Sequence, residues 1–382
     1  MRLPKRAELA QAFKHRRTES RASVRPECRS RLQATLDTLE GGRLWLADPA
    51  SIRWALGADT AVDRTARTAP VAIGFDGTDF SALAPTNEAA RIREEVLPAE
   101  IPLEVFQWHE GTIETVLPTR IDPDEAVDVP IQGMKHVSPW RFRLPVGPHD
   151  IDPYRQLGTA VARAIEEALK AAQPADTERA VARSIRETLL TDDIWAPVVL
   201  VGGASRAREY RHPVPTSATL GDYAIASVTA RREGLHASCT RTIAFEAPEW
   251  LEERHATAAR VEGAALGATR EAGRDGGRAG AVMQTIKEAY AAADWPDEWT
   301  AHHQGGATGY AGREWVATPG SDIPIETPAA YAWNPTVRGA KSEDTVLVTD
   351  SGFDVLTQTG DWPTRTIEVD GEPLDRPWPL QV

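Results

Sequence analysis

Residues 223–245, YAIASVTARREGLHASCTRTIAF, restrict the possible folds of this chain more than any other stretch. Apolar and polar residues alternate on both sides of Glu233-Gly234, a dipeptide suited to a tight turn. The stretch therefore predicts a β-hairpin of two long antiparallel strands. Such strands need a hydrophobic cover on at least one face, and helices commonly supply it.

Several segments around this hairpin carry apolar residues at helical spacing and supply the expected cover. They are residues 152–172, residues 176–190 with Asp176 or Thr177 as N-cap, Pro248–Arg270 and Asp275–Ala293. Residues 330–337 and 342–349 predict two further strands around a turn at Arg338-Gly339. The second half is therefore expected to be an antiparallel sheet with helices on one face, which is an α+β fold.

The first third of the sequence predicts a smaller α/β domain. Short strands and helices alternate there: a strand at Arg43–Asp48, a helix capped by Ser51, a hairpin at Asp76-Gly77, a helix over residues 87–96 and a strand over residues 103–110. The proline-rich stretch Thr119–Asp152 has little periodicity and predicts a linker. We therefore expect domains at residues 1–145 and 146–382.

Length and charge limit the partners of the protein. The 382 residues exceed one ordinary core and suit two domains. The longest apolar run, Ile194–Ala204, is too short to span a bilayer, and the N-terminus lacks the apolar core of a secretion signal. We expect a cytoplasmic protein with no membrane partner. The net charge of −13 argues against nucleic acid, although residues 1–32 carry a net charge of +7, which we interpret as an Arg-rich first helix.

The second half contains a series of short motifs in a distinctive order. YRHPVPT (Tyr210–Thr216) precedes the hairpin, which ends in TRT; two predicted helices then precede HHQGG, and WNP and SEDTVLVT follow. This order resembles the pita-bread family of methionine and Xaa-Pro aminopeptidases, prolidases and creatinase, over about Ile151–Asp361. The resemblance implies a pita-bread catalytic domain. The first third resembles the smaller N-terminal domain of the creatinase and prolidase branch.

Peptidases of that family hold two metal ions with two Asp, one His and two Glu, and this chain departs from the pattern. Ser227 and Ser238 stand where the two Asp are expected, Gly306 stands where the liganding His is expected, and Asn334 replaces a Glu. Only Glu343 keeps its acid. Divalent ions need several carboxylate or imidazole donors. We therefore expect no metal and no other cofactor, and the two cysteines, Cys28 and Cys239, offer no zinc-ribbon spacing.

The remaining polar residues form the expected catalytic group. His212 takes the place of the family's substrate-facing histidine and, as an imidazole, suits a general base. His302 matches the first His of the family's loop. Adjacent residues of an extended segment face opposite ways, so one of His302 and His303 can reach the pocket while the other packs. The family position favours His302. Glu343 either orients His212 or binds a cationic group of the substrate; the alternative is an ion pair with Lys341 or an Arg.

Further residues are expected to line the substrate pocket. They are His303, Gln304, Ser227, Ser238, Thr240, Asn334, Tyr310 and Arg313. Gln304 either binds a substrate carbonyl or supports its own loop. The segment Gly309–Glu314, GYAGRE, resembles creatinase's YGRE, but Thr240 stands where creatinase carries a Glu, which disfavours creatine as substrate. Cys239 alternates with Ser238 and is expected to pack in the core.

These features favour a metal-independent hydrolase of a small amide, amidine or peptide-like C–N bond, with His212 as the base. The substrate would be a small molecule or a short peptide. One alternative is a metal-dependent Xaa-Pro aminopeptidase or dipeptidase. Another is an inactive relative that binds a small ligand or a protein. The resemblance also implies a homodimer.

Overall fold

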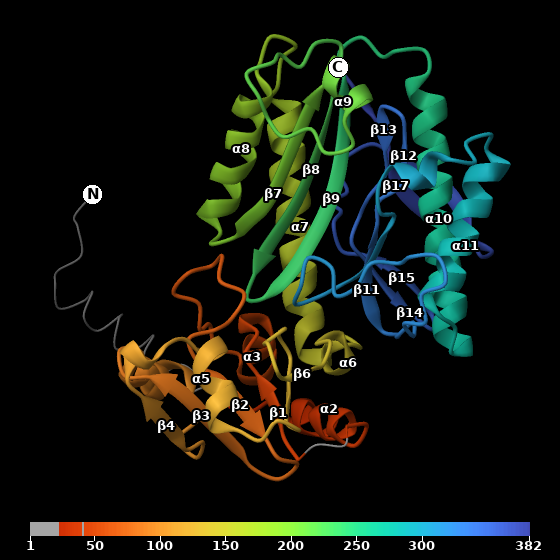
Figure 1. Ribbon diagram of the computed structural model, residues 1–382. Helices are drawn as coiled ribbons and strands as arrows, with labels where there is room; N and C mark the ends of the chain where they lie inside the picture. Colours follow the sequence, from red (N-terminus) through yellow and green to blue (C-terminus); the bar gives the residue numbers. More distant parts are fainter. Residues whose placement is uncertain (1–22, 40–41) are drawn as a thin grey trace, which may run out of the picture. The chain divides into compact units, whose positions relative to one another are not determined.

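The computed structural model describes residues 23–39 and 42–382. The chain divides between Arg143 and Leu144 into two compact units, whose elements Figure 1 labels. Residues 1–22 of the predicted Arg-rich helix lie outside the described residues, and the first described helix is α2, Pro26–Leu36. None of the helices in the described part of the chain combines the length and apolar character that crossing a membrane requires.

The first unit is built on a six-stranded sheet with the strand order β4-β3-β2-β1-β5-β6. The strands are β1 (Leu44–Leu46), β2 (Ala72–Phe75), β3 (Phe80–Pro85), β4 (Leu103–Phe106), β5 (Ala126–Val127) and β6 (Lys135–His136). The helices are α3 (Pro49–Leu56), α4 (Ala89–Arg91) with the π-helical turn η1 (Ile92–Val96), the 3-10 turn η2 (Trp108–Glu110), α5 (Ile113–Arg120) and α6 (Trp140–Arg143). Trp45, Leu83, Phe106 and Leu117 are among its buried core residues. The unit is the smaller α/β domain that the sequence predicts.

Two details of this unit differ from the expectation. Asp48, not Ser51, caps α3, because its side chain accepts a hydrogen bond from the backbone of Ala50 at 2.9 Å, whereas Ser51 lies buried inside the helix. The predicted linker contains β5 and β6, which pair in parallel and extend the sheet from β1. Strands of two residues are too short to show an alternating pattern, so the sequence gives no sign of them.

The predicted long hairpin forms the centre of the second unit. Strands β8, Tyr223–Arg232, and β9, Leu235–Ala244, pair antiparallel along their whole length. Glu233 and Gly234 both have positive φ, 52° and 90°, as a two-residue hairpin turn with the twist of the flanking strands requires. Two strands complete this sheet: β7 (Trp195–Gly203) pairs antiparallel with β8, and β18 (Leu380–Gln381) pairs parallel with β9.

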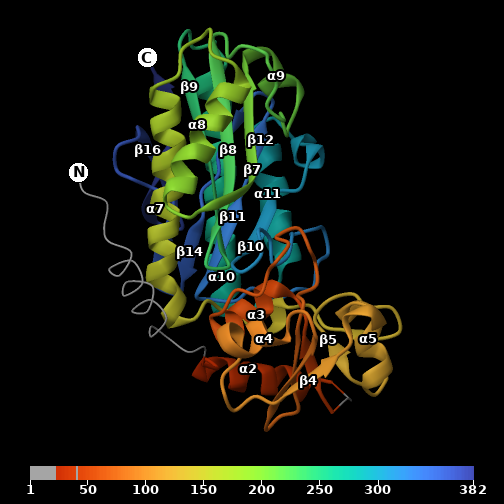
Figure 2. The same ribbon diagram turned by 90° about the vertical axis from the view of Figure 1, so that its left-hand side faces the viewer.

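Helices α7, Pro148–Lys170, and α8, Glu178–Thr191, cover this sheet. Figures 1 and 2 both show them along the same face. Val161 and Ile165 belong to the buried stripe of α7. Thr177 caps α8, because its hydroxyl accepts from the backbone of Ala180 at 3.2 Å, and this settles the choice between Asp176 and Thr177.

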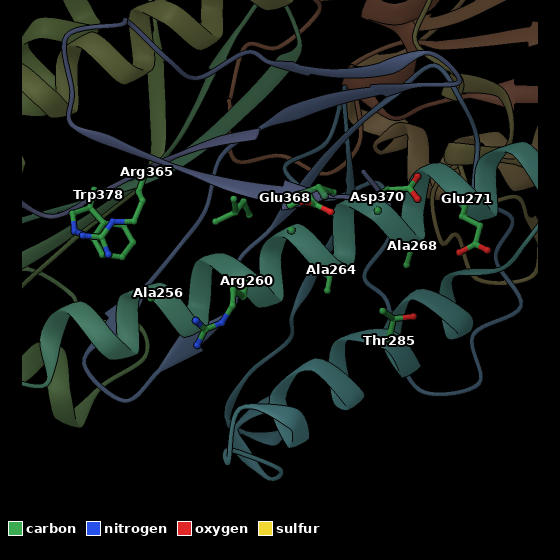
Figure 3. A pocket seen from close by; sticks show the side chains of 14 residues that line it. Ala256, Arg260, Ala264, Ala268, Glu271, Thr285, Arg365, Glu368, Asp370 and Trp378 are labelled. Atoms are coloured by element: carbon green, nitrogen blue, oxygen red, sulfur yellow. The ribbon is translucent and has the colours of Figure 1, made fainter. Parts of the chain in front are cut away.

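The rest of the second unit packs around helix α10, Leu251–Asp275. The remaining helical elements are α9 (Ala204–Glu209), α11 (Ala279–Ala292) and the 3-10 turn η3 (Glu298–Ala301). A four-stranded sheet consists of β10 (Gly305–Thr308), β11 (Ala329–Trp333), β14 (Val346–Thr349) and β15 (Gly352–Val355). Two hairpins pair β12 (Thr336–Val337) with β13 (Ala340–Lys341) and β16 (Thr364–Val369) with β17 (Glu372–Pro377). Figure 3 shows the hollow of about 740 Å³ where small side chains of α10, such as Ala264 and Ala268, lie beside β16 and α11. Antiparallel sheets with covering helices confirm the α+β class.

Candidate active site

Two cross-strand pairs of hydroxyl groups lie on one face of the β8–β9 hairpin. Ser227 faces Thr240, with Oγ and Oγ1 2.7 Å apart, and Thr229 faces Ser238 with 2.9 Å between the hydroxyl oxygens. Spacing by two residues along each strand places all four on the same face. Cys239 alternates with them and is fully buried, and burial raises the pKa of its thiol. The structure therefore brings Ser227, Ser238 and Thr240 together and puts Cys239 in the core.

Glu343 lies against these hydroxyls and is paired with two cations. Lys341 Nζ is 2.7 Å from Oε2, and Arg313 Nη2 donates to Oε1 at 3.0 Å. Thr240 Oγ1 also donates to Oε2 at 2.9 Å. Burial opposes ionisation of Glu343, but the charge of Lys341, followed by that of Arg313, outweighs it and lowers the pKa to about 2. The carboxylate is ionised, and both of its oxygens already accept hydrogen bonds from the protein.

Lys341 links Glu343 to the first hydroxyl pair. Its Nζ lies 3.3 Å from Ser227 Oγ as well as 2.7 Å from Glu343 Oε2, and its side chain is 9% exposed. Lys341 and Ser227 also contribute to the wall of a cavity of about 20 Å³, which has room for about one water molecule. An ammonium group therefore sits between two positions where the family resemblance expects metal ligands.

The residues at this place do not suit a pair of divalent ions. Four of the five expected ligand positions carry neutral side chains or none: Ser227, Ser238, Gly306 and Asn334. At the fifth, both oxygens of Glu343 are engaged, and an added metal ion would meet the charges of Lys341 and Arg313 at close range. Throughout the described residues, no group of three or more His, Cys, Asp or Glu is placed to hold a metal. The donor set fits a protein-supplied cation rather than a metal.

Three histidine rings form a second part of the site. The centroid of His212 lies 6.0 Å from that of His302 and 6.3 Å from that of His303, and the last two are 6.0 Å apart. His302 is held by Thr336, with Nε2 and Oγ1 2.9 Å apart. His212, on a separate segment, therefore lies near both rings, and which of His302 and His303 meets a substrate stays a prediction.

The three rings differ in their freedom to react. Burial, followed by the positive charge of Lys341, lowers the pKa of His212 and lowers that of His302 to about 3. Burial, followed by the charge of Arg313, lowers the pKa of His303. His212 is exposed and has no hydrogen-bond partner among the described residues. It therefore presents a neutral imidazole with both nitrogens available, whereas His302 is tied to the loop.

Gln304 serves its own loop. Its amide nitrogen donates to the backbone oxygens of Trp299 and His302 at 3.1 and 2.9 Å, and its oxygen accepts from Tyr290 Oη at 3.0 Å. The side chain is almost fully buried. Of the two roles open from sequence, the geometry favours support of the loop over contact with a substrate.

Tyr310 and Asn334 lie near the site with different surroundings. Tyr310 Oη donates to Asp150 Oδ1 at 2.8 Å and is buried, so it ties the loop after β10 to α7. The side-chain oxygen of Asn334 is buried and has no partner within the described part of the protein. It is an acceptor that a bound water or ligand can satisfy.

A buried ionic network fixes the segment that carries Glu343. Arg241 pairs with Glu166 at 3.0 Å and with Asp344 at 2.9 Å, while Arg376 pairs with Asp344 and lies 3.1 Å from Glu262. Burial raises the pKa of Glu262 to about 7. These contacts connect α7, β9, α10 and β17 next to Glu343. The position of the Glu343 carboxylate is therefore set by many elements at once, which suits a preorganised site.

Sequence reasoning treated Lys341 only as a possible partner of Glu343 and missed it as a site residue. One signal was available: Lys341 and Glu343 are two positions apart, and side chains at that spacing share a face of an extended chain. The contact of Lys341 with Ser227 spans 114 residues, and no local pattern shows it.

Comparison with known proteins agrees with this fold. A profile of metallopeptidase family M24 matches residues 152–350. The structure is similar to that of the prolidase from Pyrococcus horikoshii OT3, with a TM-score of 0.70 and 16% identity over 87% of this chain and 98% of that chain. For the Xaa-Pro dipeptidase from Bacillus anthracis the TM-score is 0.67, with 14% identity over 87% of this chain and 97% of that chain.

The fold also occurs outside proteins titled as peptidases. The N-terminal domain of FACT complex subunit SPT16 from chickpea (Cicer arietinum) has a TM-score of 0.64 and 11% identity, over 89% of this chain and 98% of that chain. A search of curated proteins by sequence finds no significant match. Because the family profile spans more than half of the chain and the pita-bread fold matches throughout, the chain belongs to metallopeptidase family M24.

Proposed function

We propose that this protein is a metal-independent hydrolase of the C–N bond of a small amide, an amidine or a short peptide. The observation that carries the proposal is the Lys341–Glu343–Arg313 ion cluster at the place of the family's metals. It supplies fixed positive charge beside an unpartnered neutral imidazole, His212. These are the two elements that hydrolysis without a metal requires: a base and a stabiliser of negative charge.

In the proposed reaction, His212 accepts a proton from the water molecule that attacks the carbonyl or amidine carbon. With an amide or peptide, negative charge then develops on the carbonyl oxygen, whereas a protonated amidine loses its positive charge. The ammonium group of Lys341 and the guanidinium group of Arg313 offset the negative charge, because both are already in place before reaction. The protonated His212 next returns its proton to the leaving nitrogen, and the C–N bond breaks. Glu343 holds the two cations and takes no proton itself.

One observation favours a second candidate, an inactive relative that binds a small ligand or a protein. Both oxygens of Glu343 are occupied, so the retained acid is not free to act on a substrate. A metal-dependent Xaa-Pro peptidase is the third candidate and is the usual activity of the family. We further propose that the protein forms a homodimer in the cytoplasm.

A substrate screen followed by one substitution separates these candidates. Short Xaa-Pro peptides, simple amides and amidines are tested for binding by the rise in melting temperature and then for turnover. His212→Ala should lower turnover by about 100- to 10,000-fold at an unchanged melting temperature. His109→Ala, a change to an exposed histidine in the first unit, is the matched control and should keep full activity.

EDTA should leave the activity of the wild-type protein unchanged. Loss of activity in EDTA with recovery in zinc, manganese or cobalt would contradict the proposal and restore the metal-dependent candidate. Tight binding of a compound without any turnover would instead support the inactive relative.

A further inference from the structure

The first unit contains a bowl of about 550 Å³, and none of its lining residues belongs to the candidate active site described above. It is formed by the loop before β2, the end of β3 with the residues that follow, and the turn η2 with the start of α5, together with Pro49 at the start of α3. Its apolar wall includes Val62, Pro70, Pro85 and Ile113. A volume of this size is in the range of ligand-binding pockets.

Two unusually exposed apolar side chains line this bowl. Val62 is 70% exposed and Trp108 is 66% exposed, the highest values among the large apolar side chains of the described residues. Apolar side chains this exposed that gather around one hollow mark interaction sites, and tryptophan is enriched among the residues that dominate binding energy.

The backbone under Trp108 is held firmly although its indole is uncovered. The amide of Trp108 donates to Thr86 Oγ1 at 3.2 Å, and the amide of Gln107 donates to Glu110 Oε1 at 2.9 Å. Gly111 follows at a φ of 144°, where a Cβ would lie 2.2 Å from Thr115 Oγ1, so the turn admits only glycine. The ring has an edge contact with His109 at 5.8 Å, and no cation of the described residues lies over it. The backbone that carries the indole is therefore held in place, and the indole itself is exposed.

The charges around the bowl favour a positively charged occupant. Asp63 accepts two hydrogen bonds from Thr65, at 2.8 and 2.7 Å, and these lower its pKa. Glu114 accepts from the hydroxyl of Thr68. Neither carboxylate has an ion-pair partner among the described residues, and Arg67 is the only base among the lining residues. The third lining acid, Glu88, is already neutralised by Arg91 at 2.7 Å.

We propose that this bowl docks a polypeptide segment that presents one arginine side chain flanked by apolar residues. The planar guanidinium group stacks on the exposed ring of Trp108, as arginine does on aromatic rings, and pairs with Glu114 or Asp63. The apolar wall, including Val62 and Ile113, receives the flanking side chains, and this is why a polypeptide suits the bowl better than a small cation.

Calorimetric titration of the full-length protein tests the proposal. The probe is a hexapeptide with one arginine between alanine, proline and valine residues, and its partner probe carries citrulline, which has the same shape without the charge. Loss of the charge should weaken binding about tenfold. Trp108→Leu and Glu114→Gln should each weaken binding of the arginine peptide by about the same factor, and added salt should weaken it further.

Trp195→Leu, which alters another exposed tryptophan in the second unit, is the matched control and should bind as the wild type does. Melting temperatures equal to that of the wild type show that the variants are folded. Equal affinity for the arginine and citrulline peptides, unchanged binding by Trp108→Leu, or no binding at millimolar peptide would each overturn the proposal. Equal affinity for arginine amide alone would overturn its polypeptide part.

Discussion

Glu343 is the acid that the family pattern retains, and its neighbours decide its role. In this chain it is 5% exposed and bonded to Lys341, Arg313 and Thr240. Its pKa of about 2 keeps it ionised across the physiological range. A buried carboxylate with two cations is a structural anchor for those cations. The orientation of His212 by Glu343, one of the roles open from sequence, has no hydrogen bond between the two to support it in the described structure.

The pair Lys341–Glu343 should show strong coupling in stability. Breaking a buried ion pair leaves an uncompensated charge, so Lys341→Met and Glu343→Gln should each cost about 3–5 kcal/mol of unfolding free energy. The double variant should cost clearly less than the sum, because the ion pair between Lys341 and Glu343 is lost only once, although Arg313 also loses its partner. Urea denaturation of the four proteins measures the coupling. Costs that add within about 0.5 kcal/mol would show that the two side chains act independently.

At the residue scale, the sequence proposes the residues of the candidate site but does not give their contacts. The difference between these residues and the ligand pattern expected from the resemblance is readable position by position, because it needs only residue identities. Other features depend on contacts that no single segment encodes. They are the position of Lys341 between Ser227 and Glu343, the hydrogen bonds of Gln304 within its own loop and the grouping of the three histidines. No periodicity within one segment contains that information.

Among the elements, the long hairpin was predictable and the shortest strands were not. Ten-residue strands around Glu233-Gly234 carry a strong alternating pattern, and the structure confirms both strands and turn. Strands β5 and β6 have two residues each, and only their pairing, β5 with β1 and β6 with β5, defines them. Helix capping is also hard to predict from sequence. Asp48 and Ser51 are both residue types that favour an N-cap, and only the structure shows that the helix begins at Pro49.

Two helical glycines should respond in opposite ways to alanine. A Cβ at Gly158 in α7 would lie 2.3 Å from the backbone oxygen of Leu356, which cannot move aside cheaply. Gly158→Ala should therefore lower stability by about 1–3 kcal/mol. At Gly267 in α10 the nearest atom is Val369 Cγ1 at 3.4 Å, an ordinary contact. Gly267→Ala should raise stability by up to about 1 kcal/mol through helix propensity. Thermal unfolding measures both, and equal effects would contradict this account of α7 packing.

For the whole molecule, the order of motifs predicted the pita-bread fold, and the family profile and solved structures confirm it. Motif order succeeds where single motifs fail because it reports the connectivity of the fold, which does not depend on the identity of the site residues. The activity does not follow in the same way, since a fold can host several functions.

The proposed homodimer should depend on salt. The net charge of −13 makes two copies repel each other, and added salt screens that repulsion. Light scattering at micromolar concentration should give the mass of a dimer at high salt and a larger monomer fraction at low salt. A monomer mass at every salt concentration would refute it.

The ammonium group beside Glu343 has a consequence for how such a protein depends on its cell. An enzyme that requires metal ions must bind them after synthesis, can exchange them for unsuitable ions and loses activity when the ions are scarce. A charge carried by Lys341 is made with the chain and is present in every copy at fixed stoichiometry. If the proposed metal-independent reaction is right, no chelator can withdraw this charge, and the site is complete as soon as folding is complete.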